Sequence, residues 1–287
     1  MRYLSSGTCC LAALITGASW SSGAIIADFT DGNGASSVDQ YQGIAGDGWD
    51  GPWGTSTSTA DLTGSVVNSS PLNGGGNYLS STLTATGASG GRGIQFRNYN
   101  DFGDVNVSAA HTISFDIRVD SSLATFNSGI DYFQMYDRIG GTDFANTGAW
   151  LVRAFGADVE NLGTTAVVGG NWAIYNGNKD GSFSNTNFVD TGVPLVAGNV
   201  YHFDVTLDPT IAEYSVTING GTTFSGLGFR NATGTVQTQV NFGGRVSDLN
   251  ETLTYSLDSI AVTNVPEPSC LLVSCLGVLG LARRRRA

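Results

Sequence analysis

The strongest constraint on the fold is a set of segments in which apolar and polar residues alternate. In HTISFDIRVD, residues 111–120, one side of an extended chain would be apolar and formed by Ile113, Phe115, Ile117 and Val119. YHFDVTLD, residues 201–208, repeats the pattern. A period of two is typical of a β-strand with one buried face. Between the two termini, no run with the period of an amphipathic helix exceeds about ten residues.

Turn signals separate these segments. Asn219-Gly220-Gly221 stands between EYSVTI and TTF, and Asn-Gly between alternating segments is a strong signal for a tight β-hairpin. Other strand candidates are GRGIQFRNY, DYFQMYD, AWLVRAFG, NWAIYNG, VQTQVNFGG and LTYSLDSIAVTNV. About ten short strands joined by such turns predict an all-β chain folded as a two-sheet jelly-roll sandwich.

One block of the chain resembles a known type of sandwich. Residues 199–224 hold a strand, an acidic turn at Asp208-Pro209 and a second strand that ends in Asn-Gly. This block resembles the central hairpin of laminin-G/concanavalin A-like domains, and YSLDSIAV, residues 255–262, resembles their closing strand. The resemblance spans residues 112–262 and implies a fold. It implies no activity, because one fold serves many functions.

The N-terminus predicts export. MRYLSSGTCCLAALITGASWSSGA has one arginine, a short apolar run and then small residues. Ser22 and Ala24 occupy the −3 and −1 positions of a cleavage site, with Ala27 as an alternative end. We therefore expect a signal peptide with a helical apolar run at residues 1–24 and a β-sandwich domain at residues 25–264. No cysteine stands within that domain, so it has neither a disulfide nor a thiolate metal site.

The C-terminus, VPEPSCLLVSCLGVLGLARRRRA, has three parts. Residues 266–268 are Pro-Glu-Pro, residues 270–282 are apolar, and the cluster that follows is Arg283, Arg284, Arg285 and Arg286. The apolar part has about 13 residues, whereas a spanning helix needs roughly 20. Arginine side chains that reach toward the interface would reduce this shortfall. We expect a short hydrophobic helix that anchors the precursor transiently in the inner membrane, with the arginines on the cytoplasmic side.

This order of parts resembles the PEP-CTERM sorting signal, over residues 265–287. Its motif residues in this chain are Pro266, Glu267 and Pro268. The resemblance implies that an exosortase-type membrane protease recognises and processes the tail, which leaves the protein at the cell surface or outside the cell. The alternative is a plain C-terminal anchor with a chance pair of prolines.

Charge excludes some partners. The sandwich domain has eight basic residues, seven of them arginine, against 23 acidic ones, and its net charge is −15. Such a charge disfavours binding to nucleic acid or to an anionic membrane surface.

A candidate glycan-binding loop lies near the start of the domain. Trp49 and Trp53 stand beside Asp47 and Asp50 in a glycine-rich segment. An indole face can stack on a sugar ring while carboxylates accept its hydroxyls, so the four residues form a candidate site. The alternative is that both rings cap the open end of the sandwich. The strand patterns place Trp150, Trp172 and Tyr175 in the core.

Evidence for a metal or for catalysis is sparse. TDGNG around Asp31 and NKDGSFSN around Asp180 gather oxygen ligands that suit Ca²⁺, although Asx turns without an ion explain them as well. The domain holds three glutamates without paired-carboxylate spacing, and we place His111 and His202 on the polar sides of their strands.

These features predict an exported, non-catalytic protein of the cell envelope or extracellular matrix that associates with exopolysaccharide. The alternative is a polysaccharide hydrolase or lyase with a concanavalin A-like fold.

Overall fold

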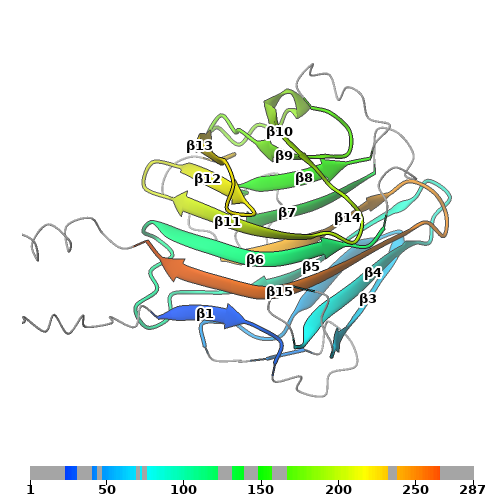
Figure 1. Ribbon diagram of the computed structural model, residues 1–287, viewed down its shortest axis with the longest axis horizontal. Helices are drawn as coiled ribbons and strands as arrows, with labels where there is room; N and C mark the ends of the chain where they lie inside the picture. Colours follow the sequence, from blue (N-terminus) through cyan, green and yellow to red (C-terminus); the bar gives the residue numbers. More distant parts are fainter. Residues whose placement is uncertain are drawn as a thin grey trace, which may run out of the picture.

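The computed structural model describes residues 23–30, 41–43, 47–68, 72, 76–121, 131–138, 148–156, 167–231 and 238–265. The predicted signal helix, the Pro-Glu-Pro motif, the apolar tail and the terminal arginines lie outside these ranges. Within the described ranges, no helix is long and apolar enough to span a membrane. The described residues form two antiparallel sheets in two layers (Figure 1).

The first sheet has eight strands in the order β13-β12-β11-β6-β15-β4-β3, with β1 paired to β15. Its strands are β1 Ala24–Ala27, β3 Ala60–Val67, β4 Tyr78–Ala85, β6 His111–Val119, β11 Val200–Asp208, β12 Glu213–Ile218, β13 Thr223–Gly228 and β15 Thr252–Asn264.

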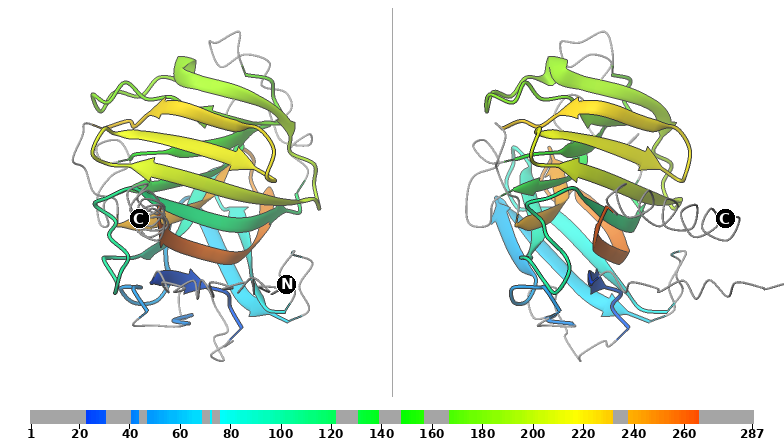
Figure 2. Two further views of the ribbon diagram at one scale, coloured as in Figure 1. Left: turned by 60° about the vertical axis from the view of Figure 1, so that its left-hand side comes forward. Right: turned by 90° about the vertical axis from the view of Figure 1, so that its left-hand side faces the viewer.

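The second sheet has seven strands in the order β10-β9-β8-β7-β14-β5-β2. Its strands are β2 Gly54–Ser58, β5 Gly91–Asn98, β7 Tyr132–Arg138, β8 Leu151–Phe155, β9 Asn171–Tyr175, β10 Phe188–Pro194 and β14 Gln239–Val246. One turn of 3₁₀ helix, η3 Asn185–Asn187, precedes β10. The strand β10 lies at one end of the molecule and β1 at the other (Figure 2). The two stacked sheets confirm the predicted all-β, two-sheet sandwich.

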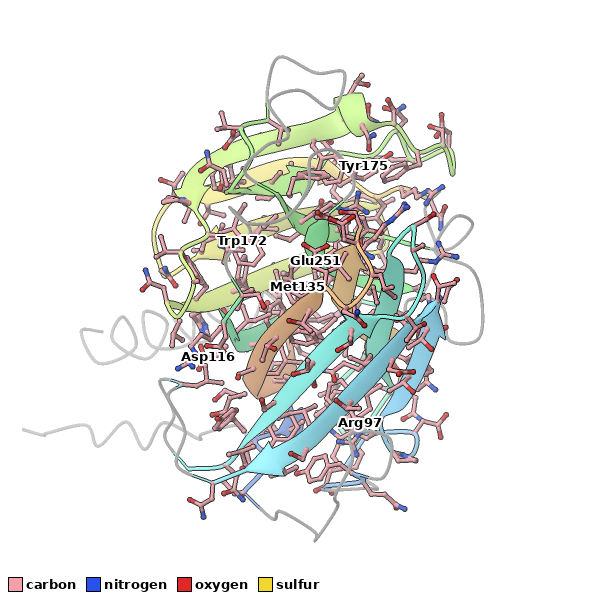
Figure 3. All side chains as sticks on the ribbon, turned by 90° about the vertical axis from the view of Figure 1, so that its right-hand side faces the viewer. Arg97, Asp116, Met135, Trp172, Tyr175 and Glu251 are labelled. Carbon is pink, nitrogen blue, oxygen red and sulfur yellow. The ribbon has the colours of Figure 1, made fainter. Side chains whose placement is uncertain are left out.

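The core lies between the sheets, where the alternating residues of both layers meet. The predicted inward side of β6 is confirmed, since Ile113, Phe115, Ile117 and Val119 have no exposed surface. Phe115 stacks on Phe203 of the neighbouring strand β11, with ring centroids 5.4 Å apart. From the second sheet come Trp150, which stacks on Phe115, and Trp172, which lies in the interior with Met135 (Figure 3). Trp150 and Trp172 are therefore core residues, as predicted.

The hairpin between β12 and β13 also follows the prediction. Asn219 and Gly220 both have positive φ angles, of 53° and 63°. A turn with two left-handed residues matches the twist of the flanking strands, and Asn and Gly are the residues that adopt it most easily.

The two ends of the described domain meet on β15. Along its first half β15 pairs with β4, and beyond a bulge after Asp258 it pairs with β1, so that Ala24 lies opposite Thr263. Ile25 is fully buried in this pairing. Signal cleavage after Ala24 would keep residues 25–27 of β1 in the mature chain, whereas cleavage after Ala27 would remove the buried Ile25 from the core.

The second sheet carries apolar residues on its outer face as well. Trp150, which directly precedes β8, faces the core together with Val152 and Ala154 of that strand, and the opposite phase carries Leu151 and Phe155. The outer residues form a separate apolar cluster of Tyr136, Leu151, Phe155, Val167, Ala173, Tyr175 and Phe188. Tyr175 is thus buried, as expected for a core residue, but in this outer cluster rather than between the sheets.

Candidate functional site

The predicted tryptophan site is buried. Trp49 is 4% exposed and Trp53 is 1% exposed. The indole Nε1 of Trp49 donates a hydrogen bond to the carbonyl oxygen of Ile26 at 2.7 Å. The guanidinium carbon of Arg97 lies 4.7 Å from the centroid of that ring, and Tyr99 meets the ring edge-on. Trp49 therefore offers no open face to a sugar.

Trp53 is enclosed in the same way, between Phe29 of the chain's start and Phe242 of β14. Asp47 and Asp50 are exposed, whereas the two indoles near them in the sequence are buried. The burial agrees with the interpretation in which both rings cap the end of the sandwich. It disagrees with the interpretation in which they stack on sugar.

Arg97 is a residue that sequence reasoning missed. It is fully buried on the inner face of β5, where it donates from Nε to the carbonyl of Gly51 at 3.1 Å and from Nη2 to that of Gly43 at 2.7 Å. Nη2 also donates to the carbonyl of Gln42. The side chain thereby fixes the loop that carries Trp49, because buried carbonyls need hydrogen-bond donors.

The calcium candidates show an Asx turn at one position. The carboxylate of Asp180 accepts a hydrogen bond from the backbone N–H of Ser182 at 2.8 Å. Hydrogen bonds from the Ser182 side chain and backbone lower the pKa of Asp180. In the ranges that the structure describes, no three His, Cys, Asp or Glu residues are placed to hold a metal ion. Asp31 lies outside the described residues.

The two histidines have different environments, and the prediction for one of them is wrong. His111 shares the phase of Ile113 and is fully buried rather than on the polar side of β6. Burial lowers its pKa, and its Nδ1 lies 2.9 Å from the carbonyl oxygen of Ala109. His202 lies on the outer face of the first sheet, where its Nδ1 is 2.7 Å from Asp116 Oδ1 and its Nε2 is 3.3 Å from Asp204 Oδ1.

Asp258 stands beside this histidine–aspartate group. It is the cross-strand partner of Asp116, and it accepts a hydrogen bond from the N–H of Ser259 at 2.7 Å. Burial, together with the charges of Asp116 and Asp28, raises the pKa of Asp258 to about 6. The folded protein therefore holds a proton on Asp258 that the unfolded chain releases at lower pH.

This shift predicts a pH-dependent stability. An acid whose pKa is raised on folding contributes stability below its unfolded pKa of about 4, and that contribution is lost as the pH rises through about 6. Asp258→Asn should therefore raise the free energy of unfolding at pH 8 by about 1–2 kcal/mol, after allowance for solvent screening. The difference should nearly vanish at pH 3, where Asp258 is protonated in both the folded and the unfolded chain. Urea unfolding at both pH values measures it, and an equal effect at the two would contradict the assignment.

A cavity in the described structure forms a groove on the outer face of the second sheet. It has a volume of about 510 Å³ and crosses from β2 through β5, β14 and β7 to β8. Ser56, Thr57 and Ser58 line one end, where Ser56 and Ser58 share the outer face with their partners Ile94 and Arg92, and Phe183 and Arg230 line the other end. A smaller hollow of about 200 Å³ shares Ser58 and Arg92 with it.

The sheet register explains which side chains face the groove. Cross-strand partners share a face, so the pairing of Arg245 with both Arg92 and Tyr132 sets these three residues in one row. A second row lies two residues further along β7 from Tyr132, where Gln134 pairs with Arg153 of β8. Arg138 of β7 lies on the same face, paired with Gln239.

Three arginines of the groove donate hydrogen bonds to neutral oxygens. Arg153 donates to the side-chain oxygen of Gln134 from Nη2 at 2.6 Å and from Nε at 3.2 Å, and its guanidinium lies 4.1 Å from the Tyr132 ring centroid. Arg138 donates from Nε to the side-chain oxygen of Gln239. Arg230 donates from Nε to the carbonyl of Gly181 at 3.0 Å, with its guanidinium 5.2 Å from the Phe183 ring.

The sequence contains a signal for this groove that the strand patterns did not isolate. Arg92, Arg138 and Arg153 each stand on the phase opposite to core residues of their strands. That phase identifies an outward arginine, but it does not show that three different strands present their arginines to one groove.

Comparison with known proteins identifies the C-terminal segment. Residues 264–286 match the family model described as the PEP-CTERM protein-sorting motif. The predicted sorting motif is thereby confirmed, and it implies an exported protein that is anchored in the membrane before processing. No curated protein matches the chain.

Several solved structures share the fold at low sequence identity. A sialidase aligns with 85% of this chain at 12% identity and a TM-score of 0.50, and the chain spans 18% of the sialidase's length. A carbohydrate esterase from the Shiga toxin-encoding bacteriophage phi24B aligns with 84% of this chain and 98% of its own, at 13% identity and a TM-score of 0.47. A lectin from Ulex europaeus aligns with 74% of this chain and 98% of its own, at 14% identity and a TM-score of 0.40. At these identities the likeness concerns the fold alone.

Proposed function

We propose that this chain is an exported, non-catalytic protein of the cell envelope or matrix that binds exopolysaccharide in the groove of its second sheet. An exosortase-type protease processes its tail. The groove is the observation that carries the proposal. It spans five neighbouring strands, which at roughly 4.8 Å per strand is about 19 Å. That length accommodates several sugar units of a chain rather than one small molecule.

The lining has the chemistry that carbohydrate binding needs. The hydroxyls of Ser56 and Ser58, the amide of Gln134 and guanidinium groups supply many hydrogen-bond donors and acceptors. Tyr132 and Phe183 add aromatic surface, and Phe183 is 38% exposed. A concave surface that combines apolar groups with convergent polar groups is typical of a ligand site.

The composition of the lining favours binding over hydrolysis. Glycosidases use two placed carboxylic acids. Among the described residues, neither the groove nor the adjoining hollow is lined by an aspartate or a glutamate. The competing function, a polysaccharide hydrolase or lyase, is tested by the release of reducing ends and of unsaturated sugars.

A matched pair of variants tests the site. Ser56→Trp places a large ring at the groove's end, whereas Ser225→Trp makes the same change at an exposed position on β13, an edge strand of the first sheet. Retention of the domain, residues 25–265, is measured on the organism's own exopolysaccharide and on a panel of charged and neutral polysaccharides.

We expect Ser56→Trp to lose retention and Ser225→Trp to keep it, with no product released from any polysaccharide. Equal loss in both variants, or a wild-type domain that binds no polysaccharide, would overturn the proposed function. Product release that Ser56→Trp abolishes would support the enzyme instead.

A further inference from the structure

The distribution of arginine in the fold is uneven. Of the seven arginines in the domain, five line the groove or the adjoining hollow, namely Arg92, Arg138, Arg153, Arg230 and Arg245. The other two have separate roles: Arg97 is buried in the core, and Arg118 forms an ion pair with Asp120 on the first sheet. A domain with a net charge of −15 therefore gathers most of its positive charge on one surface.

Three arginines of the groove, on β5, β7 and β8, are without an ion pair among the described residues. No ion pair with a described carboxylate involves Arg92, Arg138 or Arg153, and the hydrogen-bond acceptors of Arg138 and Arg153 are neutral amide oxygens. Guanidinium groups collected in one groove repel one another. Burial adds to this cost at Arg153, whose pKa it lowers. A bound anion would relieve the repulsion.

The hydrogen-bonded amides hold the guanidinium groups in place. Gln239, which accepts from Arg138, donates in turn to the side-chain oxygen of Asn98 at 2.7 Å, so a chain of side chains crosses β7, β14 and β5. The side-chain oxygen of Gln134 accepts two hydrogen bonds from one edge of the Arg153 guanidinium, from Nε and Nη2. Ordered guanidinium groups bind carboxylate and other oxyanions through paired hydrogen bonds at little further cost in side-chain entropy.

We infer that the groove selects an acidic polysaccharide, one that carries carboxylate or sulfate groups along its chain. This inference rests on the proposed function of the groove. Across the sheet, Arg92 on β5 lies two strands from Arg138 on β7, and Arg153 on β8 lies one strand from Arg138. Along the strands, the register offsets Arg138 by six residues from Arg92 and by four from Arg153, so the three arginines are spread over the groove. They would meet separate anionic groups of one polysaccharide, while the hydroxyl-lined end binds neutral parts of the sugars.

Paired polymers separate charge from sugar recognition. Binding of the domain is measured to polygalacturonate and to its fully methyl-esterified form, which has the same backbone without the charge. Dextran sulfate and dextran give the same comparison for sulfate. We expect the wild-type domain to bind at least one acidic polymer about tenfold or more tightly than its neutral partner, and to lose affinity as salt rises.

Arginine variants locate the binding. The double variant Arg92→Gln with Arg138→Gln should weaken binding to that acidic polymer by about tenfold or more, because charge-assisted hydrogen bonds from two guanidinium groups to its anionic groups would be lost. Arg118→Gln alone removes an arginine from the other sheet and should change the affinity less than twofold. Thermal unfolding verifies that each variant is folded.

The outcomes separate the two proposals. Equal binding to the acidic and neutral members of both pairs would overturn the inference and leave the proposed function standing. Equal losses from Arg118→Gln and from the groove variant would assign the binding to overall charge and also overturn the inference. A domain that binds none of the four polymers and no exopolysaccharide would overturn both.

Discussion

Replacing Trp53 by alanine should lower the free energy of unfolding by about 3–5 kcal/mol, the usual cost of removing a buried aromatic side chain. Trp53 is 1% exposed and packs between Phe29 and Phe242, with ring centroids 6.2 Å from each. The variant would leave a cavity at the contact between the chain's first segment and β14. The melting temperature of the domain should fall by about 10 °C.

The control for this change is in the same loop. Asp50 is exposed, and its backbone N–H bonds to the carbonyl of Asn98, a contact that alanine keeps. Asp50→Ala should therefore change the free energy of unfolding by less than about 0.5 kcal/mol. Urea unfolding of residues 25–265 measures both variants. A Trp53→Ala domain as stable as wild type would contradict the buried position of Trp53. It would favour the interpretation in which the ring is exposed and stacks on a sugar.

The second large effect is expected on the processing and membrane retention of the C-terminal tail. Replacing Pro266 and Pro268 by alanine should block processing and leave a larger, membrane-bound precursor, because the protease would no longer find its extended Pro-Glu-Pro segment. Replacing Arg283, Arg284, Arg285 and Arg286 by asparagine should instead impair membrane retention of the precursor, since the cytoplasmic charges that oppose translocation are lost.

Cell fractionation with antibody detection of the sandwich domain distinguishes the two defects by size and location. A wild-type protein found in the cytoplasm, uncut at both ends, would contradict this account of sorting.

The acidic composition and the arginine-lined groove are compatible. Net charge excludes binding modes that depend on the whole surface, such as non-specific attraction to nucleic acid. A groove has its own local field, because interactions between charges decay within about 10 Å at ordinary ionic strength. The remaining surface then carries the acidic residues, which keep the exported domain soluble and repel anionic polymers from other approaches.

The sequence alone determined three features of the protein: which side of most strands is apolar, the Asn219-Gly220 hairpin and the sorting motif. Each depends on neighbours within a few residues: alternation sets which side of a strand is apolar, and a tight turn needs residues that accept positive φ. The prediction for His111 was wrong even at this level, because it shares the phase of the buried Ile113 at the start of β6.

Only the tertiary structure shows that Trp49 and Trp53 are buried and that a groove lies on the second sheet. Trp49 and Trp53 have the composition of an exposed sugar-binding loop, but Arg97, Phe29 and Phe242 cover them from distant parts of the chain. The groove depends on strand order, which places β14 between β5 and β7 and thereby sets Arg245 beside Arg92. Local patterns show which way a side chain points, whereas its neighbours across the sheet depend on the pairing of strands far apart in sequence.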